Sequence, residues 1–134
     1  MPRGNWRDDP SIPNEAPLWR GIVDPDEIVD DPSSGGKLPS SGALITKELS
    51  VDIGTETTPQ AVIDKGRSQG VDWRLWEFSA GKARDAGCIV DRDPQPDDPA
   101  HAVVLRADSP GGKRVRQSSA KKLKDSGHWQ DGGR

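Results

Sequence analysis

The sequence has one cysteine, one phenylalanine and no tyrosine among its 134 residues, and it has no long apolar run. A single cysteine excludes a disulfide within the chain, and no cysteine and histidine array has the spacing of a zinc site. The first residues lack the apolar segment of a secretory signal, and no stretch approaches membrane-spanning length. We therefore expect a cytoplasmic protein with no metal, no cofactor and no membrane contact.

Apolar residues are scarce as well. They make up 31 % of the chain, whereas glycine occurs 15 times and proline 12 times. This composition predicts one small domain with a thin core, in which the five tryptophans supply much of the apolar volume. Prolines break the polar start of the chain, so we expect a flexible arm over residues 1–17, a single domain over 18–127 and a tail over 128–134.

The net charge of −3 hides an asymmetry: residues 1–112 carry a net charge of −8 and residues 113–134 one of +5. Such a basic segment favours an acidic partner or a nucleic acid. The alternative is a solvated helix face followed by a loose tail. The candidate binding residues are Lys113, Arg114, Arg116, Lys121, Lys122 and Lys124.

Short β-branched runs between turn residues predict a small, mostly antiparallel sheet. Capping residues predict three or four short helices, and long Pro/Gly loops join the elements, so the expected fold class is α+β. The expected strands cover residues 18–23, 43–45, 49–53, 71–78, 88–90 and 102–105. The expected helices cover 24–29, 80–86 and 118–124, together with one that begins at 58 and ends at either 66 or 70. By alternation, one core is expected to contain Leu49, Val51, Trp73, Leu75, Val103 and Leu105.

The stretch from Cys88 to Ala107 organises the chain, because it places two apolar runs either side of a loop rich in proline and aspartate. His101 stands where this loop becomes the second run. A histidine there is a candidate acid or base that a nearby carboxylate, Asp97 or Asp98, could orient. The alternative is a histidine that bonds to the proline loop and fixes its shape.

Two more residues are candidates for a site. Arg20 lies inside a short expected strand, where a guanidinium needs an acid or a phosphate as its partner. The alternative is an edge-strand arginine paired with an aspartate. Asp52 alternates with the apolar residues of its expected strand and is a candidate orienting or electrostatic carboxylate.

The chain resembles a group of small, uncharacterised bacterial proteins. The resemblance rests on LSVD at residues 49–52, on DPQPDDPAHAVV at 93–104 and on the segment from Gly112 to Trp129. It covers most of residues 18–129, and it implies a bacterial cytoplasmic domain without an assigned activity.

A fainter likeness is to compact ADP-ribosyltransferase-like folds, which use an Arg or His on an early strand, a Ser or Thr leading a second strand, and a Glu on a late strand. Arg20 and either Ser40 or Ser50 match the first two positions. The late glutamate is missing, since His101 and Ala102 stand in that region. This likeness implies nucleotide binding.

Two functions are therefore expected. The first is a small cytoplasmic accessory protein that binds another macromolecule, most simply a protein. The second is a nucleotide-handling enzyme or toxin-related domain that uses Arg20 and His101. An enzyme should bring Arg20, Ser50, Asp52 and His101 to one cleft, whereas a binding module should scatter them and expose an apolar patch.

Overall fold

The computed structural model describes residues 5–23 and 25–130, and it has the predicted α+β fold. Asp24, at the start of one expected helix, residues 1–4 of the expected arm and residues 131–134 of the expected tail lie outside the described residues. Six strands form one antiparallel sheet in the order β6-β7-β4-β1-β5-β8, and two more form a separate hairpin, β2-β3.

The strands of the main sheet have the following bounds: β1 Pro17–Val23, β4 Leu49–Ile53, β5 Trp73–Ser79, β6 Cys88–Arg92, β7 His101–Arg106 and β8 His128–Trp129. The hairpin strands are β2 Ile28–Asp30 and β3 Lys37–Pro39, followed by a 3-10 turn, η1, at Ser41–Ala43. The helices are α1 Pro59–Ser68, α2 Ala80–Asp85 and α3 Gln117–Ser126. No helix in the described ranges is long and apolar enough to cross a membrane.

Two helix starts follow directly from the sequence. The Thr58 hydroxyl accepts a hydrogen bond from the amide of Ala61 at 3.1 Å, and Pro59 takes the first position of α1. The Ser79 hydroxyl accepts from the amide of Lys82 at 3.1 Å and caps α2, which Gly87 follows with φ +88°. Both helices were expected from these residues.

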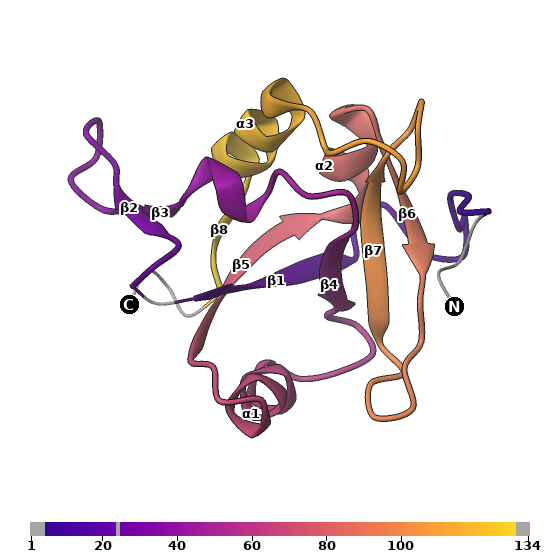
Figure 1. The fold of residues 1–134 in the computed structure, drawn as a ribbon, viewed down its shortest axis with the longest axis horizontal. Helices are drawn as coiled ribbons and strands as arrows, with labels where there is room; N and C mark the ends of the chain where they lie inside the picture. The colour runs from indigo at the N-terminus through magenta and orange to yellow at the C-terminus, as the bar shows by residue number, and fades with distance from the viewer. Residues whose placement is uncertain (1–4, 24, 131–134) are drawn as a thin grey trace.

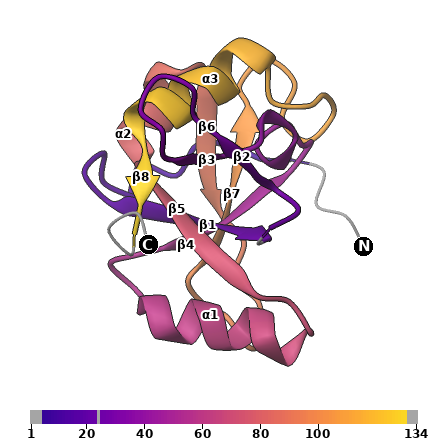
Figure 2. The same cartoon turned by 90° about the vertical axis from the view of Figure 1, so that its left-hand side faces the viewer.

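The sheet separates two apolar clusters of unequal size. Figures 1 and 2 show α1 on one side of the sheet and α2 with α3 on the other. The larger cluster lies on the side of α2 and α3 and includes Leu49, Val51 and Phe78. The smaller lies under α1 and consists of Trp19, Val62 and Leu75, with Ile63 and Trp73 packed against it.

The prediction of one shared core is therefore wrong. Leu49 and Val51 belong to the larger cluster, whereas Trp73 and Leu75 belong to the smaller one. Alternation within a strand assigns residues to two faces, but it does not say which faces of different strands coincide. That correspondence comes from the register of β1 against β4 and β5.

The segment before β1 is packed on the domain. The prediction of a flexible arm is therefore wrong for the described residues of that segment. The side chain of Ile12 is fully buried, and Arg84 of α2 donates to the carbonyls of Asp9 and Ile12 at 2.9 Å each. The amide of Asp9 also donates to the carbonyl of Val90 at 2.8 Å. Residues 8–12 thus cover the outer edge of β6, which would otherwise present unpaired backbone groups.

The end of the described chain also belongs to the domain, although a tail was expected from residue 128. Trp129 of β8 is buried, and its ring meets the Trp76 ring edge-on at 4.9 Å between centroids. Its indole N–H donates to the carbonyl of Lys37 at 2.9 Å. The Ser119 hydroxyl of α3 donates to the carbonyl of Ala86 at 2.6 Å and so joins α3 to the end of α2, while β8 pairs with β5 in the sheet.

Two expected elements have a different structure. Residues 25–27 form a turn and Ile28–Asp30 form β2, where a short helix was expected. Residues 43–45 include the end of η1 and no strand. In both places tertiary contacts outweigh local propensity. Strand β2 pairs with β3, and Leu44, which follows η1, is fully buried in the core.

Candidate functional site

A polar cleft of about 500 Å³ opens on the α1 side of the sheet. Helix α1 packs on β5 and β1, and the cleft lining extends from β1 onto β4 and the start of β7. The alternating residues of β4 that face away from the larger core, Ser50 and Asp52, are therefore part of the cleft wall. The loop between β6 and β7 closes the opposite side.

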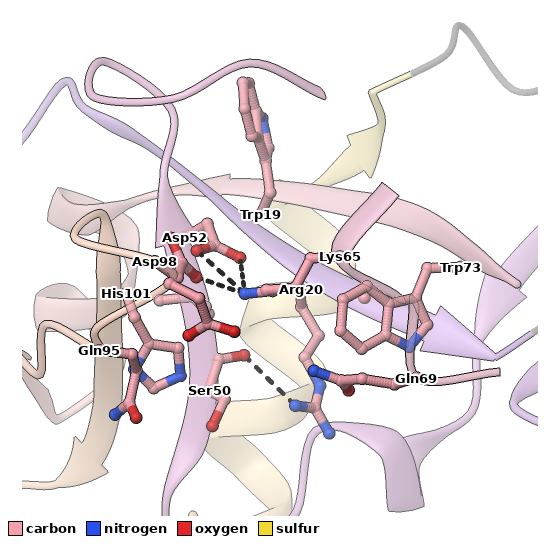
Figure 3. A pocket seen from close by; sticks show the side chains of 13 residues that line it. Trp19, Arg20, Ser50, Asp52, Lys65, Gln69, Trp73, Gln95, Asp98 and His101 are labelled. Carbon is pink, nitrogen blue, oxygen red and sulfur yellow. Dashed lines mark hydrogen bonds and ion pairs between the residues drawn. The ribbon is translucent and has the colours of Figure 1, made fainter. Parts of the chain in front are cut away.

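The cleft contains all four residues whose convergence was the expected sign of an enzyme: Arg20, Ser50, Asp52 and His101. They come from three strands, β1, β4 and β7, which are neighbours in the sheet. Figure 3 shows His101, Gln95 and Asp98 on one side, Trp73, Gln69 and the Arg20 guanidinium on the other, and Ser50 and the Lys65 amine between them.

Arg20 reaches the cleft because β1 and β4 separate beside it. The two strands pair only at Leu18 with Ile53 and at Trp19 with Asp52, and Figure 1 shows them diverging beyond this point. Arg20 Nη1 donates to the carbonyl of Ser50 at 3.3 Å, a backbone group that a closer β1 would have bonded. Its Nε donates to the carbonyl of Ala43 at 3.2 Å.

The hydrogen-bond acceptors of the Arg20 side chain, Ala43 and Ser50, both contribute neutral carbonyls. No carboxylate among the described residues forms an ion pair with its guanidinium, and β1 is a central strand, so the alternative of an edge-strand arginine paired with an aspartate does not hold there. Burial lowers the pKa of the Arg20 guanidinium, while Glu27 opposes that change. An arginine stays charged at neutral pH, so a cation without a carboxylate partner faces the cleft.

Lys65 of α1 holds two buried carboxylates together at the base of the cleft. Its Nζ lies 3.0 Å from Asp52 Oδ2, and it also forms an ion pair with Asp98 Oδ2. The side chains of Asp52 and Asp98 are 5 % and 10 % exposed. The sequence did not single out Lys65, because its position depends on how α1 is placed over the sheet.

The pKa values of the two carboxyl groups in this cluster are displaced in opposite directions. Burial, together with the hydrogen bond with Asp98, raises the pKa of Asp52 to about 7 against the opposing effect of Lys65. Burial would also raise the pKa of Asp98, but the hydrogen bonds from Asp52 and Lys65 lower it overall. Interaction between two close carboxyl groups separates their pKa values in this way. A carboxyl group whose pKa is near 7 suits proton transfer at neutral pH.

The orientation of His101 differs from the expected one. Its Nδ1 lies 3.0 Å from the backbone carbonyl of Asp93 and 3.3 Å from Asp93 Oδ2, whereas Asp98 bonds to Lys65. Because a carbonyl can only accept, Nδ1 carries a proton, and in the neutral form of the ring Nε2 is then an acceptor. His101 therefore fixes the proline loop, as one alternative expected, and it also lines the cleft.

The Trp73 indole forms a wall of the cleft, and two glycines leave the space that it occupies. A Cβ on Gly21 of β1 would lie 2.8 Å from Cγ of the indole, and one on Gly66 of α1 would lie 2.8 Å from Cε3. The indole is therefore held between strand and helix. Lys65 Nζ lies 5.8 Å from the centre of this ring.

The six basic residues expected to bind an acidic partner lie away from this cleft, in and before α3. Arg116 forms an ion pair with Asp108 at 2.7 Å, and Lys121 forms one with Asp125 at 2.7 Å. Lys124 donates to the hydroxyl of Ser41 at 3.4 Å. The other three, Lys113, Arg114 and Lys122, are exposed.

No protein family, curated protein or solved structure matches the chain. The resemblances to small bacterial proteins and to ADP-ribosyltransferase-like folds remain predictions. In residues 5–23 and 25–130, no group of three His, Cys, Asp or Glu side chains is arranged to hold a metal ion. The single cysteine, Cys88, is buried, and burial raises the pKa of its thiol to about 11, which does not suit a nucleophile.

Proposed function

We propose that the chain is a nucleotide-handling protein that binds its ligand in this cleft and acts on it by proton transfer. Arg20 holds the anionic group, and Asp52 and His101 exchange protons with the ligand. The observation that supports this best is the Arg20 guanidinium, which faces the cleft without a carboxylate partner in the described chain and beside two acid or base groups. A volume of about 500 Å³ suits a small molecule.

Calorimetric titration with adenosine 5′-monophosphate, ribose 5-phosphate and adenosine tests the binding step. The wild type should bind the two phosphates and bind adenosine at least tenfold more weakly. Arg20→Lys keeps the charge but loses the planar fork, which should weaken phosphate binding by about 1.5–3 kcal/mol, or roughly ten- to a hundredfold.

Arg67→Lys is the matched control, because Arg67 is an exposed arginine of α1 outside the cleft lining. It should leave all three affinities unchanged. Melting temperatures recorded with and without phosphate identify any loss of folding in Arg20→Lys. Equal affinity of the wild type for adenosine and its phosphate, or binding of none of the three, would overturn the proposal.

Proton transfer is tested by turnover. Nucleotides incubated with the wild type and followed by phosphorus and proton NMR should give product, whereas Asp52→Asn should bind the same nucleotide and give at least a hundredfold less. Asp64→Asn, an exposed change on α1, should be as active as the wild type. Full turnover in Asp52→Asn would remove the catalytic part of the proposal.

The hypothesis of an accessory protein remains a prediction. Its support is the set of basic residues in and before α3, three of which have the contacts described above. On the surface of the described residues, Val29 at 41 % exposure is the one large apolar side chain that is exposed. An apolar docking patch, which this hypothesis expected, is therefore not seen on that surface.

A further inference from the structure

The two ends of the cleft differ in hydrogen-bonding character. One end, formed by β1 and α1, contributes the Arg20 guanidinium and the amide of Gln69, which Figure 3 shows pointing toward Arg20. The other end, formed by the loop from residue 93 to His101, contributes Gln95, Asp98 and His101. A ligand that fills the cleft meets a cationic donor at one end and this loop at the other.

The loop end presents acceptors. His101 Nδ1 lies against the carbonyl of Asp93 at 3.0 Å, so in the neutral form of the ring Nε2 is left to accept. Gln95 Nε2 donates to the carbonyl and the carboxylate of Asp93 at 3.2 and 3.1 Å, which leaves its Oε1 as an acceptor. The Asp98 carboxylate bonds Lys65 and Asp52, and its two oxygens have further lone pairs that can accept.

The loop end of the cleft is held in place by its own hydrogen bonds before a ligand binds. The amides of Gln95 and Asp98 donate to each other's carbonyls at 3.0 and 3.1 Å, and the amide of Asp93 donates to the carbonyl of His101 at 2.9 Å. Prolines 94, 96 and 99 restrict the same loop further. Acceptors fixed in this way lose little conformational freedom on binding.

Neutral hydrogen-bond donors fit the loop end of the cleft better than cationic donors. Lys65 already places an ammonium group on Asp98 and Asp52, so a second cation beside it would be repelled. Hydroxyl groups donate hydrogen bonds without adding charge. The complementary ligand therefore carries an anion at one end and two or more hydroxyls at the other.

We propose that the cleft recognises a ribose 5-phosphate unit, with the phosphate on Arg20 and the sugar hydroxyls on the acceptors of Gln95, Asp98 and His101. This inference rests on the proposed function and specifies which part of a nucleotide the site reads. It assigns sugar selectivity to the loop between β6 and β7, and phosphate selectivity to β1.

Calorimetry with ribose 5-phosphate and 2-deoxyribose 5-phosphate tests the assignment on the full chain. The wild type should bind the deoxy sugar about ten- to a hundredfold more weakly, since a hydrogen bond to a charged or fixed acceptor is lost. In Gln95→Ala and in Asp98→Asn this preference should shrink by at least threefold. Gln95 is exposed, so Gln95→Ala keeps the test valid if Asp98→Asn fails to fold.

The outcomes separate this inference from the proposed function. Equal binding of both sugars by the wild type would overturn the sugar subsite and leave Arg20 and the phosphate untouched. A preference for ribose that persists unchanged in Gln95→Ala and Asp98→Asn would place the hydroxyls elsewhere and would also overturn it. Binding of neither sugar phosphate would overturn both proposals. Asp64→Asn on α1 is the control and should keep the wild-type preference.

Discussion

Asp52 of β4 and His101 of β7 stand directly opposite each other in the antiparallel register, and both line the cleft. Side chains paired in this way lie on one face of the sheet, with Cβ atoms about 4.5–5.5 Å apart. Two groups that can exchange protons are thus within reach of one ligand atom. They belong to different predicted strands, and only the pairing of β4 with β7 brings them together.

The pH dependence of stability should change in Asp52→Asn. Burial raises the pKa of Asp52 from 3.8 to about 7, so between these values the unfolded chain loses a proton that the folded protein keeps. Asp52 therefore destabilises the wild type progressively from about pH 4 to 7, by up to about 1.4 kcal/mol per pH unit, and its cost is constant above pH 7.

Urea denaturation of Asp52→Asn at pH 5 and pH 8 measures this contribution. The variant should gain stability relative to the wild type as the pH rises, because asparagine has no proton to lose. Asp64→Asn, at an exposed position of α1, should show no such trend. A difference from the wild type that is the same at both pH values would show that Asp52 ionises normally in the folded protein.

Lys65→Met should destabilise the fold by about 2–4 kcal/mol, because it leaves two buried carboxylates without their cation. Lys121→Met is the control. It breaks an ion pair with Asp125 whose side chains are 75 % and 64 % exposed, so it should change stability by about 0.5 kcal/mol or less. Denaturant midpoints at pH 7 compare the two variants. Equal midpoints would mean that the ion pairs of Lys65 with Asp52 and Asp98 contribute nothing to stability.

Gly21→Ala should lower stability by about 1–3 kcal/mol, because the new methyl group would overlap the Trp73 indole. Gly42→Ala is the matched change, since a Cβ there meets no atom within 4 Å. Thermal melts of both variants give the comparison. If Gly21→Ala melts at the temperature of Gly42→Ala, Trp73 does not lie against β1.

Arg84→Ala should release the segment before β1. Arg84 Nε lies 2.9 Å from Asp8 Oδ1, and this arginine also bonds to three other groups of residues 9–14. Hydrogen exchange at the amide of Val90, which donates to Asp8 at 3.0 Å, should become at least tenfold faster. Lys82→Ala, on the same helix, is the control, and unchanged exchange in both variants would contradict this account of the segment.

Local signals predicted much of the secondary structure and four residues of the cleft. Thr58 with Pro59 and Ser79 with Gly87 mark their helices, and alternation identifies β4. The described part of the segment before β1 was missed because its order depends on Arg84, which is far away in the sequence. Lys65 and Gln69 were missed for a similar reason, since the position of α1 on the sheet depends on the small cluster around Trp19.

The central claim is that the ligand binds between Arg20 and His101, and amide NMR titration with adenosine 5′-monophosphate tests it most directly. The proposal predicts that the largest shifts fall on Arg20, Ser50 and His101 and on the loop from residue 93, and that Arg20→Lys reduces them. Shifts confined to residues 113–124, or no shifts at millimolar nucleotide, would contradict it.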